Sequence, residues 1–174
     1  MRKFVVVALL VAACKAKQTA PLSANLAAEN KVTVRAVTLY YQNLDMLLGV
    51  EQRNVALPEN PAAAMSVVVR ELFKPPASRA HAPSFPRDTV VRGAYLLPDG
   101  TAFVDLGGPT LTQGWGTGSH EELMAVYAVV HTVTANFPDA KRVRILVNGE
   151  PAETLAGHIN IARSLGPMPS LVAR

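Results

Sequence analysis

The acids, bases and potential metal ligands of this 174-residue sequence are few and widely spaced. The candidates are His120, Glu121, Glu122, His131, His158, Asp99 and Asp105. His120 and His131 are eleven residues apart, which is about 16 Å along a helix and too far for both to bind one metal ion. Glu121 and Glu122 are adjacent and cannot face each other across a substrate bond. We therefore predict no metal, no cofactor and no enzymatic activity.

Two of these residues keep a second interpretation. His131 follows Tyr127 by four residues beside an apolar stripe, which favours a hydrogen-bonded structural histidine over a catalytic base. His158 fits either a structural role at a strand end or a place in a site. An envelope hydrolase built on His158 and a carboxylate such as Asp105 is one hypothesis, although Ser119 lacks the G-x-S-x-G setting of a hydrolase nucleophile.

A glycine-rich segment with one tryptophan is the candidate interaction loop, formed by Trp115, Gly116, Gly118 and Ser119. Its backbone N–H groups before a helix could hold an anion, but it has neither the lysine of a P-loop nor the spacing of a dinucleotide fingerprint. Trp115 is either a lid packed on the core or an exposed contact anchor. Because aromatic rings stack on sugar faces, a lipoprotein that binds peptidoglycan or a small ligand is the alternative function.

The only cysteine, Cys14, ends a basic and then apolar N-terminal segment. Small residues precede it, and the whole segment resembles the bacterial lipoprotein signal, in which such a cysteine is acylated and becomes the new N-terminus. An ordinary secretory signal followed by an unreactive cysteine is the alternative. We expect a signal peptide over 1–13, a flexible tether over 14–30, and a domain over 31–174. Lys15 after the cysteine resembles lipoproteins sorted to the outer membrane of Gram-negative bacteria.

Charge and cysteine content restrict the partners further. Arg2 and Lys3 leave with the signal, so the net charge falls from +4 to +2, and no nucleic-acid partner is expected. The apolar stretch 4–11 is far shorter than the ~20 residues that span a bilayer. The lipid is therefore the expected link to the membrane, on the periplasmic or extracellular side. A single cysteine also excludes an internal disulfide, so stability must come from packing.

The order of elements predicts an α+β domain. Alternating apolar residues favour a strand over 32–41, followed by an irregular stretch over 44–57. Asn60 and Pro61 begin a helix that ends near 74. The Pro98-Asp99-Gly100 turn joins hairpin strands over 89–97 and 101–106.

In the second half, Ser119 and Glu122 have capping-box spacing at the start of a helix that runs to 137. A strand over 142–147 ends at Asn148-Gly149, with a short return over 150–155. We expect the order β-α-β-β-α-β plus a C-terminal extension, as a two-layer sandwich with both helices on one face of a mixed or antiparallel sheet.

Several separated motifs resemble the GerMN domain of sporulation and spore-germination proteins. The family's motifs are a V-x-L-Y strand, an A-x-V-D-L strand, a G-S-x-E-E helix start, a V-x-I-L-V-D-G strand and a final L-x-G-H. Segments that resemble them occur in this order at 34–41, 101–106, 118–122, 143–149 (with Asn148 in place of the Asp) and 155–158. The resemblance implies a non-catalytic interaction or assembly module on a lipidated envelope protein, with no established cofactor. Its partners would be unidentified envelope proteins or further copies in a homo-oligomer. Because the sequence contains one copy and not a tandem pair, the resemblance does not imply assembly into a ring or channel. It does not imply sporulation either.

Overall fold

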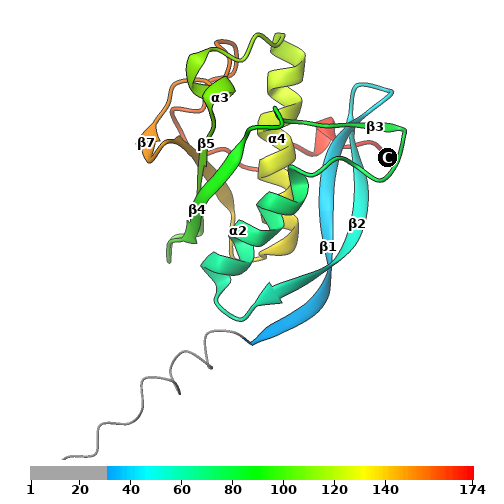
Figure 1. Ribbon diagram of the computed structural model, residues 1–174, viewed down its shortest axis with the longest axis vertical. Helices are drawn as coiled ribbons and strands as arrows, with labels where there is room; N and C mark the ends of the chain where they lie inside the picture. Colours follow the sequence, from blue (N-terminus) through cyan, green and yellow to red (C-terminus); the bar gives the residue numbers. More distant parts are fainter. Residues whose placement is uncertain (1–30) are drawn as a thin grey trace, which may run out of the picture.

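The computed structural model describes residues 31–174. The predicted signal, Cys14 and the tether therefore lie outside the described residues. Within 31–174 no helix is both long and apolar enough to cross a bilayer. The chain forms two β-sheets and a small number of helices, which confirms the predicted α+β class (Figure 1).

A long antiparallel hairpin forms the first sheet. Strands β1 (Val32–Asn43) and β2 (Leu48–Pro58) pair from Val32↔Pro58 to Gln42↔Leu48, and the short β3 (His81–Ala82) pairs with the end of β1. The expectation of an irregular stretch over 44–57 was wrong. Polar residues in the middle of β2 have low strand propensity, but pairing with β1 and burial of Leu48, Val55 and Leu57 outweigh that preference.

The second sheet has the order β4-β5-β6-β7. It contains the predicted hairpin, β4 (Val90–Leu96) and β5 (Thr101–Gly107), and the predicted strand β6 (Arg142–Val147), which lies parallel to β5. The return strand β7 is shorter than expected (Glu150–Pro151). Asn148 and Gly149 have φ of 55° and 84°, the left-handed pair that a tight hairpin turn requires.

Three α-helices and one 3₁₀ turn complete the domain: α2 (Pro61–Leu72), α3 (Pro109–Gln113), α4 (Ser119–Asn136) and η1 (Pro169–Leu171). Asn60 caps α2 as predicted, because its Oδ1 accepts the Ala63 N–H at 3.0 Å. The capping-box prediction for α4 was wrong, since Gly118 is the N-cap and the buried Glu122 side chain binds elsewhere.

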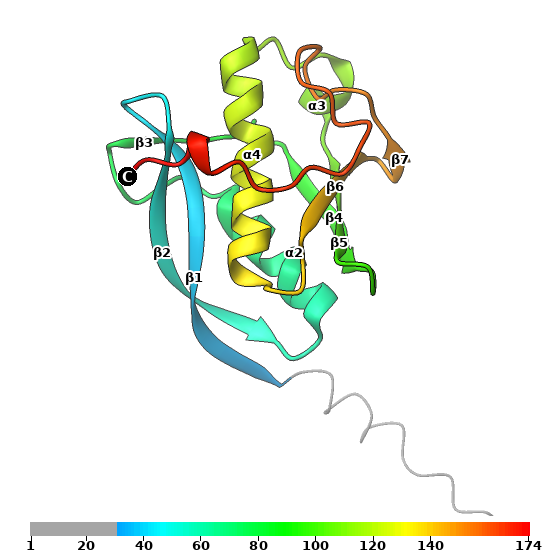
Figure 2. The ribbon, with the colours of Figure 1, turned by 180° about the vertical axis from the view of Figure 1, so that it is seen from behind.

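Helix α4 lies between the two sheets and is buried on every side from Met124 to Val133. Figures 1 and 2 show the β1–β2 hairpin on one side of α4 and the β4–β7 sheet on the other, with α2 packed beside it. The single sheet expected from the sequence is therefore two sheets joined through helices. A helix buried all round needs apolar residues on more than one face, and the run 124–130 provides them.

Side chains of α4 also cover part of the free edge of β1. Asn136 accepts the Thr38 N–H at 2.9 Å and donates to the Thr38 carbonyl at 2.7 Å, and Thr132 Oγ1 accepts the Tyr40 N–H at 3.1 Å. Thr38 is the residue nearest the start of β1 that takes part in these bonds. Residues 32–36, which precede it, are all exposed, so the first part of β1 extends beyond the helix.

Candidate functional site

The candidate acids and bases are dispersed, and five of the seven have structural partners: Asp99, Asp105, Glu122, His131 and His158. Asp99 accepts the Thr101 N–H at 2.9 Å and pairs with Arg142 at 2.7 Å. Asp105 accepts the Gly149 N–H at 2.7 Å and pairs with Arg92 at 3.2 Å. Within residues 31–174 no three His, Cys, Asp or Glu side chains gather where they could hold a metal ion.

His131 is buried and bonded as a structural histidine. Its Nε2 lies 3.1 Å from both the Met168 N–H and the Met168 carbonyl oxygen, so α4 holds the C-terminal segment through this ring. Burial lowers the pKa of His131 below its ordinary value, and the contact with the Met168 carbonyl opposes that shift only in part. A neutral ring fits this position, because one nitrogen must accept the Met168 N–H.

Glu122 and His158 meet, although the capping-box spacing predicted a helix cap at Glu122 and the hydrolase hypothesis paired His158 with Asp105. One Glu122 oxygen accepts the N–H groups of Leu155 and Ala156, each at 2.8 Å, and the other accepts the His158 N–H at 2.8 Å and lies 3.1 Å from His158 Nδ1. Glu122 is completely buried. Burial acts to raise the pKa of Glu122, but the bonds from the 155–159 backbone hold it below its ordinary value.

This contact joins two of the motifs seen in the sequence. The second glutamate of the G-S-x-E-E segment binds the backbone of the L-x-G-H segment, 33 to 36 residues further along the chain. His158 has 41% of its side chain exposed, and no nucleophile bonds to it among the described residues. The arrangement is that of a carboxylate that fastens a loop.

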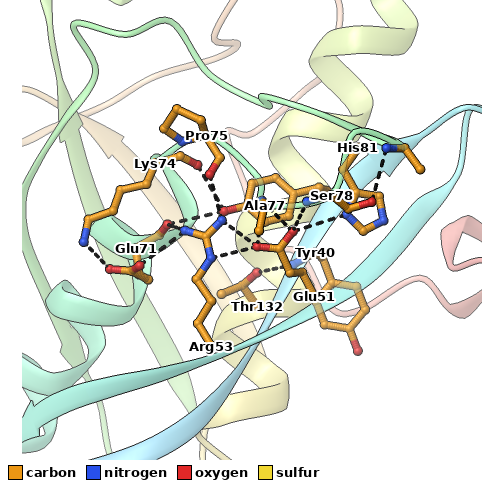
Figure 3. A network of polar contacts seen from close by, with 12 residues as sticks. Tyr40, Glu51, Arg53, Glu71, Lys74, Pro75, Ala77, Ser78, His81 and Thr132 are labelled. Carbon is orange, nitrogen blue, oxygen red and sulfur yellow. Dashed lines mark hydrogen bonds and ion pairs between the residues drawn. The ribbon is translucent and has the colours of Figure 1, made fainter.

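A second carboxylate network, partly accessible to solvent, was not predicted from the sequence (Figure 3). Arg53 on β2 lies 2.6 Å from Glu51 and 3.3 Å from Glu71 on α2, and it donates to the Pro75 carbonyl at 2.8 Å. Glu51 also accepts the Ala77 N–H at 2.9 Å. The alternation of Glu51 and Arg53 puts both on one face of a strand, and that signal was hidden because this stretch was predicted to be irregular.

The same network perturbs two acids. Burial acts to raise the pKa of Glu51, but hydrogen bonds from Ala77, Arg53 and Ser78 hold it below its ordinary value. Burial raises the pKa of Tyr41 to about 12 against the attraction of Arg53, whose guanidinium lies 5.6 Å from the Tyr41 ring centre. The Tyr41 hydroxyl donates to the Lys74 carbonyl at 3.1 Å. The network fastens the segment after α2 to the first sheet.

The candidate interaction loop lies between α3 and α4. Trp115 is half-buried and stacks on Phe85, with ring centres 5.7 Å apart and an angle of 26° between the planes. The Thr117 N–H donates to the Trp115 carbonyl at 2.7 Å. Gly116 is exposed, and Gly118 and Ser119 begin α4. Trp115 thus packs on the core with one part of its ring and is exposed to solvent with another, as a mixture of the two predicted alternatives. Its role in binding stays a prediction.

The outer face of the β1–β2 hairpin is an exposed surface without charge. We define it by the exposed residues Val32, Val34, Ala36, Val50, Gln52, Asn54 and Ala56. Val34 has 67% of its surface exposed and Val50 48%. Beside it, the backbone edge of residues 32–36 has no strand or helix partner among the described residues. This edge also contains the exposed Arg35. Exposed strand edges are sites at which another chain can add a strand.

Comparison with known proteins gives one family and one fold. Residues 38–153 match the family model described as "Sporulation and spore germination", which bears the name Germane. A candidate lipoprotein from Clostridium perfringens is similar in structure, with a TM-score of 0.55 at 17% identity over 82% of this chain and 93% of that chain. Comparison with curated proteins yields no match.

The sporulation protein GerM from Bacillus subtilis is also similar in structure. Its tandem GerMN domains match with a TM-score of 0.55 at 20% identity over 77% of this chain and 46% of that chain. Its first GerMN domain alone matches with a TM-score of 0.54 at 18% identity over 80% of this chain and 98% of that one. The described part of this chain thus corresponds to one domain of the pair.

Proposed function

The chain belongs to the sporulation and spore germination (Germane) family, and on that premise we propose that it is a lipid-anchored, non-catalytic interaction module of the bacterial cell envelope. The proposal rests mainly on the observation that several of the candidate acids and bases already form hydrogen bonds within the domain. Glu122, His131, Asp99 and Asp105 are each bonded to backbone groups of their own domain. Groups that hold loops in place are not free to transfer protons to a substrate.

The outer face of the β1–β2 hairpin supports the interaction role. A partner that adds an extended segment beside residues 32–36 would gain backbone hydrogen bonds there and apolar contacts with Val32 and Val34. Strand β1 also begins directly after the proposed tether. A module on such a tether can present this face to proteins at the membrane surface.

The anchor is proposed from the N-terminal sequence, and the likeness to a candidate lipoprotein supports it. Cys14→Ser removes the thiol to which lipid would be attached. We expect the wild-type chain to incorporate labelled fatty acid and to enter the detergent phase on phase partition, and the variant to do neither. A variant that still incorporates the label, or a wild-type chain that remains uncut in the cytosol, would contradict the anchor.

The interaction role is tested by a photo-crosslinking amino acid placed at Val34. We expect discrete crosslinked products in cells from position 34 and none from the exposed Arg163, which serves as the control. Mass spectrometry of the product then distinguishes a second copy of this chain from another envelope protein. An absence of products from position 34, when the protein is folded and present at its normal level, would contradict the use of this face.

A further inference from the structure

A depression beside the interaction loop has the composition of a sugar-binding site. It has a volume of about 440 Å³ and lies where the end of β1, the 82–86 segment, the start of α3 and the 115–121 segment meet. Small-ligand pockets have volumes of roughly 300–1,000 Å³. None of the residues that line the depression belongs to the two carboxylate networks described above. Those networks therefore do not explain why these residues gather there.

Its aromatic wall is rigid. Trp115 stacks on the buried Phe85, and Phe85 in turn packs on Phe73 with ring centres 4.5 Å apart. One side of the indole is therefore fixed from behind, while the half-buried ring also lines the depression. Gly114 and Gly116, on either side of Trp115, have no atoms within 4 Å of the position that a Cβ would occupy. The backbone on both sides of Trp115 is therefore open to solvent.

The polar part of the lining is rich in neutral groups. Gln42, Ser84 and Thr117 contribute an amide and two hydroxyls. Ser84 Oγ is closed off from solvent and has no hydrogen-bond partner within residues 31–174, so a ligand in the depression does not reach it. Gln42 and Thr117 are therefore the neutral groups of the lining that a ligand can bond.

The negative charge of the lining disfavours anionic ligands. Glu121 is the one charged residue of the lining, and no Lys, Arg or His is part of it. A phosphate, sulfate or carboxylate would meet a carboxylate without a balancing cation. A neutral ligand with several hydroxyls can donate to Glu121 and Gln42 and can place an apolar face on the indole.

We propose that this depression binds a neutral pyranose unit of a glycan. The C–H face of the sugar stacks on Trp115, and its hydroxyls bond to Gln42 and Glu121. The depression shares no residue with the outer face of the β1–β2 hairpin, so the two proposals can fail independently. An envelope module with such a site can hold a polysaccharide and a protein partner at the same time.

The test uses the single tryptophan of the chain. The full-length protein, in a detergent that contains no sugar, is titrated with chitotetraose and cellotetraose while Trp115 fluorescence is recorded, and calorimetry provides a second readout. We expect a saturable change with at least one neutral oligosaccharide and none with heparin. Tighter binding of heparin, binding of a proline-rich peptide alone, or no saturable signal by either method at millimolar sugar would overturn the proposal.

Variants place the binding in the depression. Trp115→Ala should weaken binding by calorimetry roughly tenfold or more, as for loss of a central aromatic anchor, and Glu121→Gln should weaken it roughly fivefold. Tyr95→Ala is the matched control, because Tyr95 is exposed and stacks on Phe103 in the other sheet. Affinity that falls equally in Tyr95→Ala, or stays unchanged in a folded Trp115→Ala protein, would overturn the assignment.

Discussion

Glu51 on β2 and Glu122 on α4 each accept N–H groups from a distant loop, but only Glu51 has a guanidinium beside it. Glu51 holds the segment at Ala77 and is balanced by Arg53 at 2.6 Å. Glu122 holds the 155–158 loop and is surrounded by neutral backbone donors and one half-exposed histidine ring. Both carboxylates hold a loop through its backbone N–H groups, but the negative charge of Glu51 is balanced by Arg53, whereas that of Glu122 is stabilised mainly by the N–H groups themselves.

The difference shows that a buried carboxylate can be held by peptide groups in place of a cation. Three N–H groups point at Glu122, and its place in the first turn of α4 adds the favourable field of the helix N-terminus. All these donors come from the folded chain itself. The free energy that retains the 155–158 loop should therefore depend on Glu122 more than the 74–78 segment depends on any one member of its network.

The largest expected effect is that of Glu122→Ala. It leaves the N–H groups of Leu155, Ala156 and His158 without their acceptor. The buried Leu155 N–H left unpaired costs about 1–3 kcal/mol, and the partly buried N–H groups of Ala156 and His158 add smaller costs. We expect a loss of about 3–5 kcal/mol in the free energy of unfolding, measured by urea denaturation followed by circular dichroism. Glu121→Ala is the control, because Glu121 is exposed and should change stability by less than about 0.5 kcal/mol. Equal losses would refute the role of Glu122.

Arg53→Met should have a smaller effect. It leaves Glu51 and Glu71 without their shared cation, but both carboxylates stay partly accessible to solvent, at 10% and 14% of their side chains. We expect a loss of about 2 kcal/mol, below the 3–5 kcal/mol for a fully buried pair. The double variant Arg53→Met/Glu51→Gln should recover part of that loss, because the neutral amide needs no cation. A double variant less stable than Arg53→Met alone would contradict this account.

Much of the fold was predictable because its signals are local. The proline and asparagine at the start of α2, the Pro-Asp-Gly turn and the Asn-Gly turn act within a few residues, and each prediction was confirmed. Strand β2 was missed because the middle of its sequence is polar and has low strand propensity. What makes it a strand is its pairing with β1, which its own sequence does not reveal. Division into two sheets was also missed, since the burial of α4 on all sides depends on elements that are distant along the chain.

The polar sites were the least predictable part. Glu122 had the spacing of a capping residue, and its true partners lie 33 to 36 residues away. The structural role of His131 followed from its position beside an apolar helix face, but its partner Met168 did not. Sequence spacing identifies which side chains can meet on one helix, whereas contacts with a distant loop require the complete fold.

Stability should depend on pH in one range through His131 and in a lower range through the two carboxylates. Because the folded-state pKa of His131 lies below its ordinary 6.5, its contribution is present above that value and is lost as the pH falls through the folded-state pKa. Glu122 and Glu51 also have lowered pKa values, so their contributions are present above their ordinary 4.5 and are lost at lower pH. We expect the unfolding temperature to fall in two stages, below 6.5 and below 4.5.

Single variants assign each stage of that acid response. His131→Asn should remove the decline that begins near 6.5 and leave the one below 4.5. Glu122→Gln and Glu51→Gln should each make the lower stage shallower, because a neutral amide takes up no proton. Thermal unfolding monitored by circular dichroism between pH 3 and 8 checks both statements. A His131→Asn protein with the wild-type curve above 4.5 would show that another group causes the first stage.

The smallest expected effect is that of His158→Ala, which asks how much a side-chain partner adds to a carboxylate already held by the backbone. The variant loses the 3.1 Å contact between Nδ1 and Glu122 but keeps the His158 N–H bond to the same carboxylate. Because the ring is 41% exposed, we expect a loss of about 0.5–1 kcal/mol, measured by urea denaturation. A loss as large as that of Glu122→Ala would mean that the imidazole is to Glu122 what Arg53 is to Glu51. The contrast between the two carboxylates would then disappear, because each would depend on a side-chain partner.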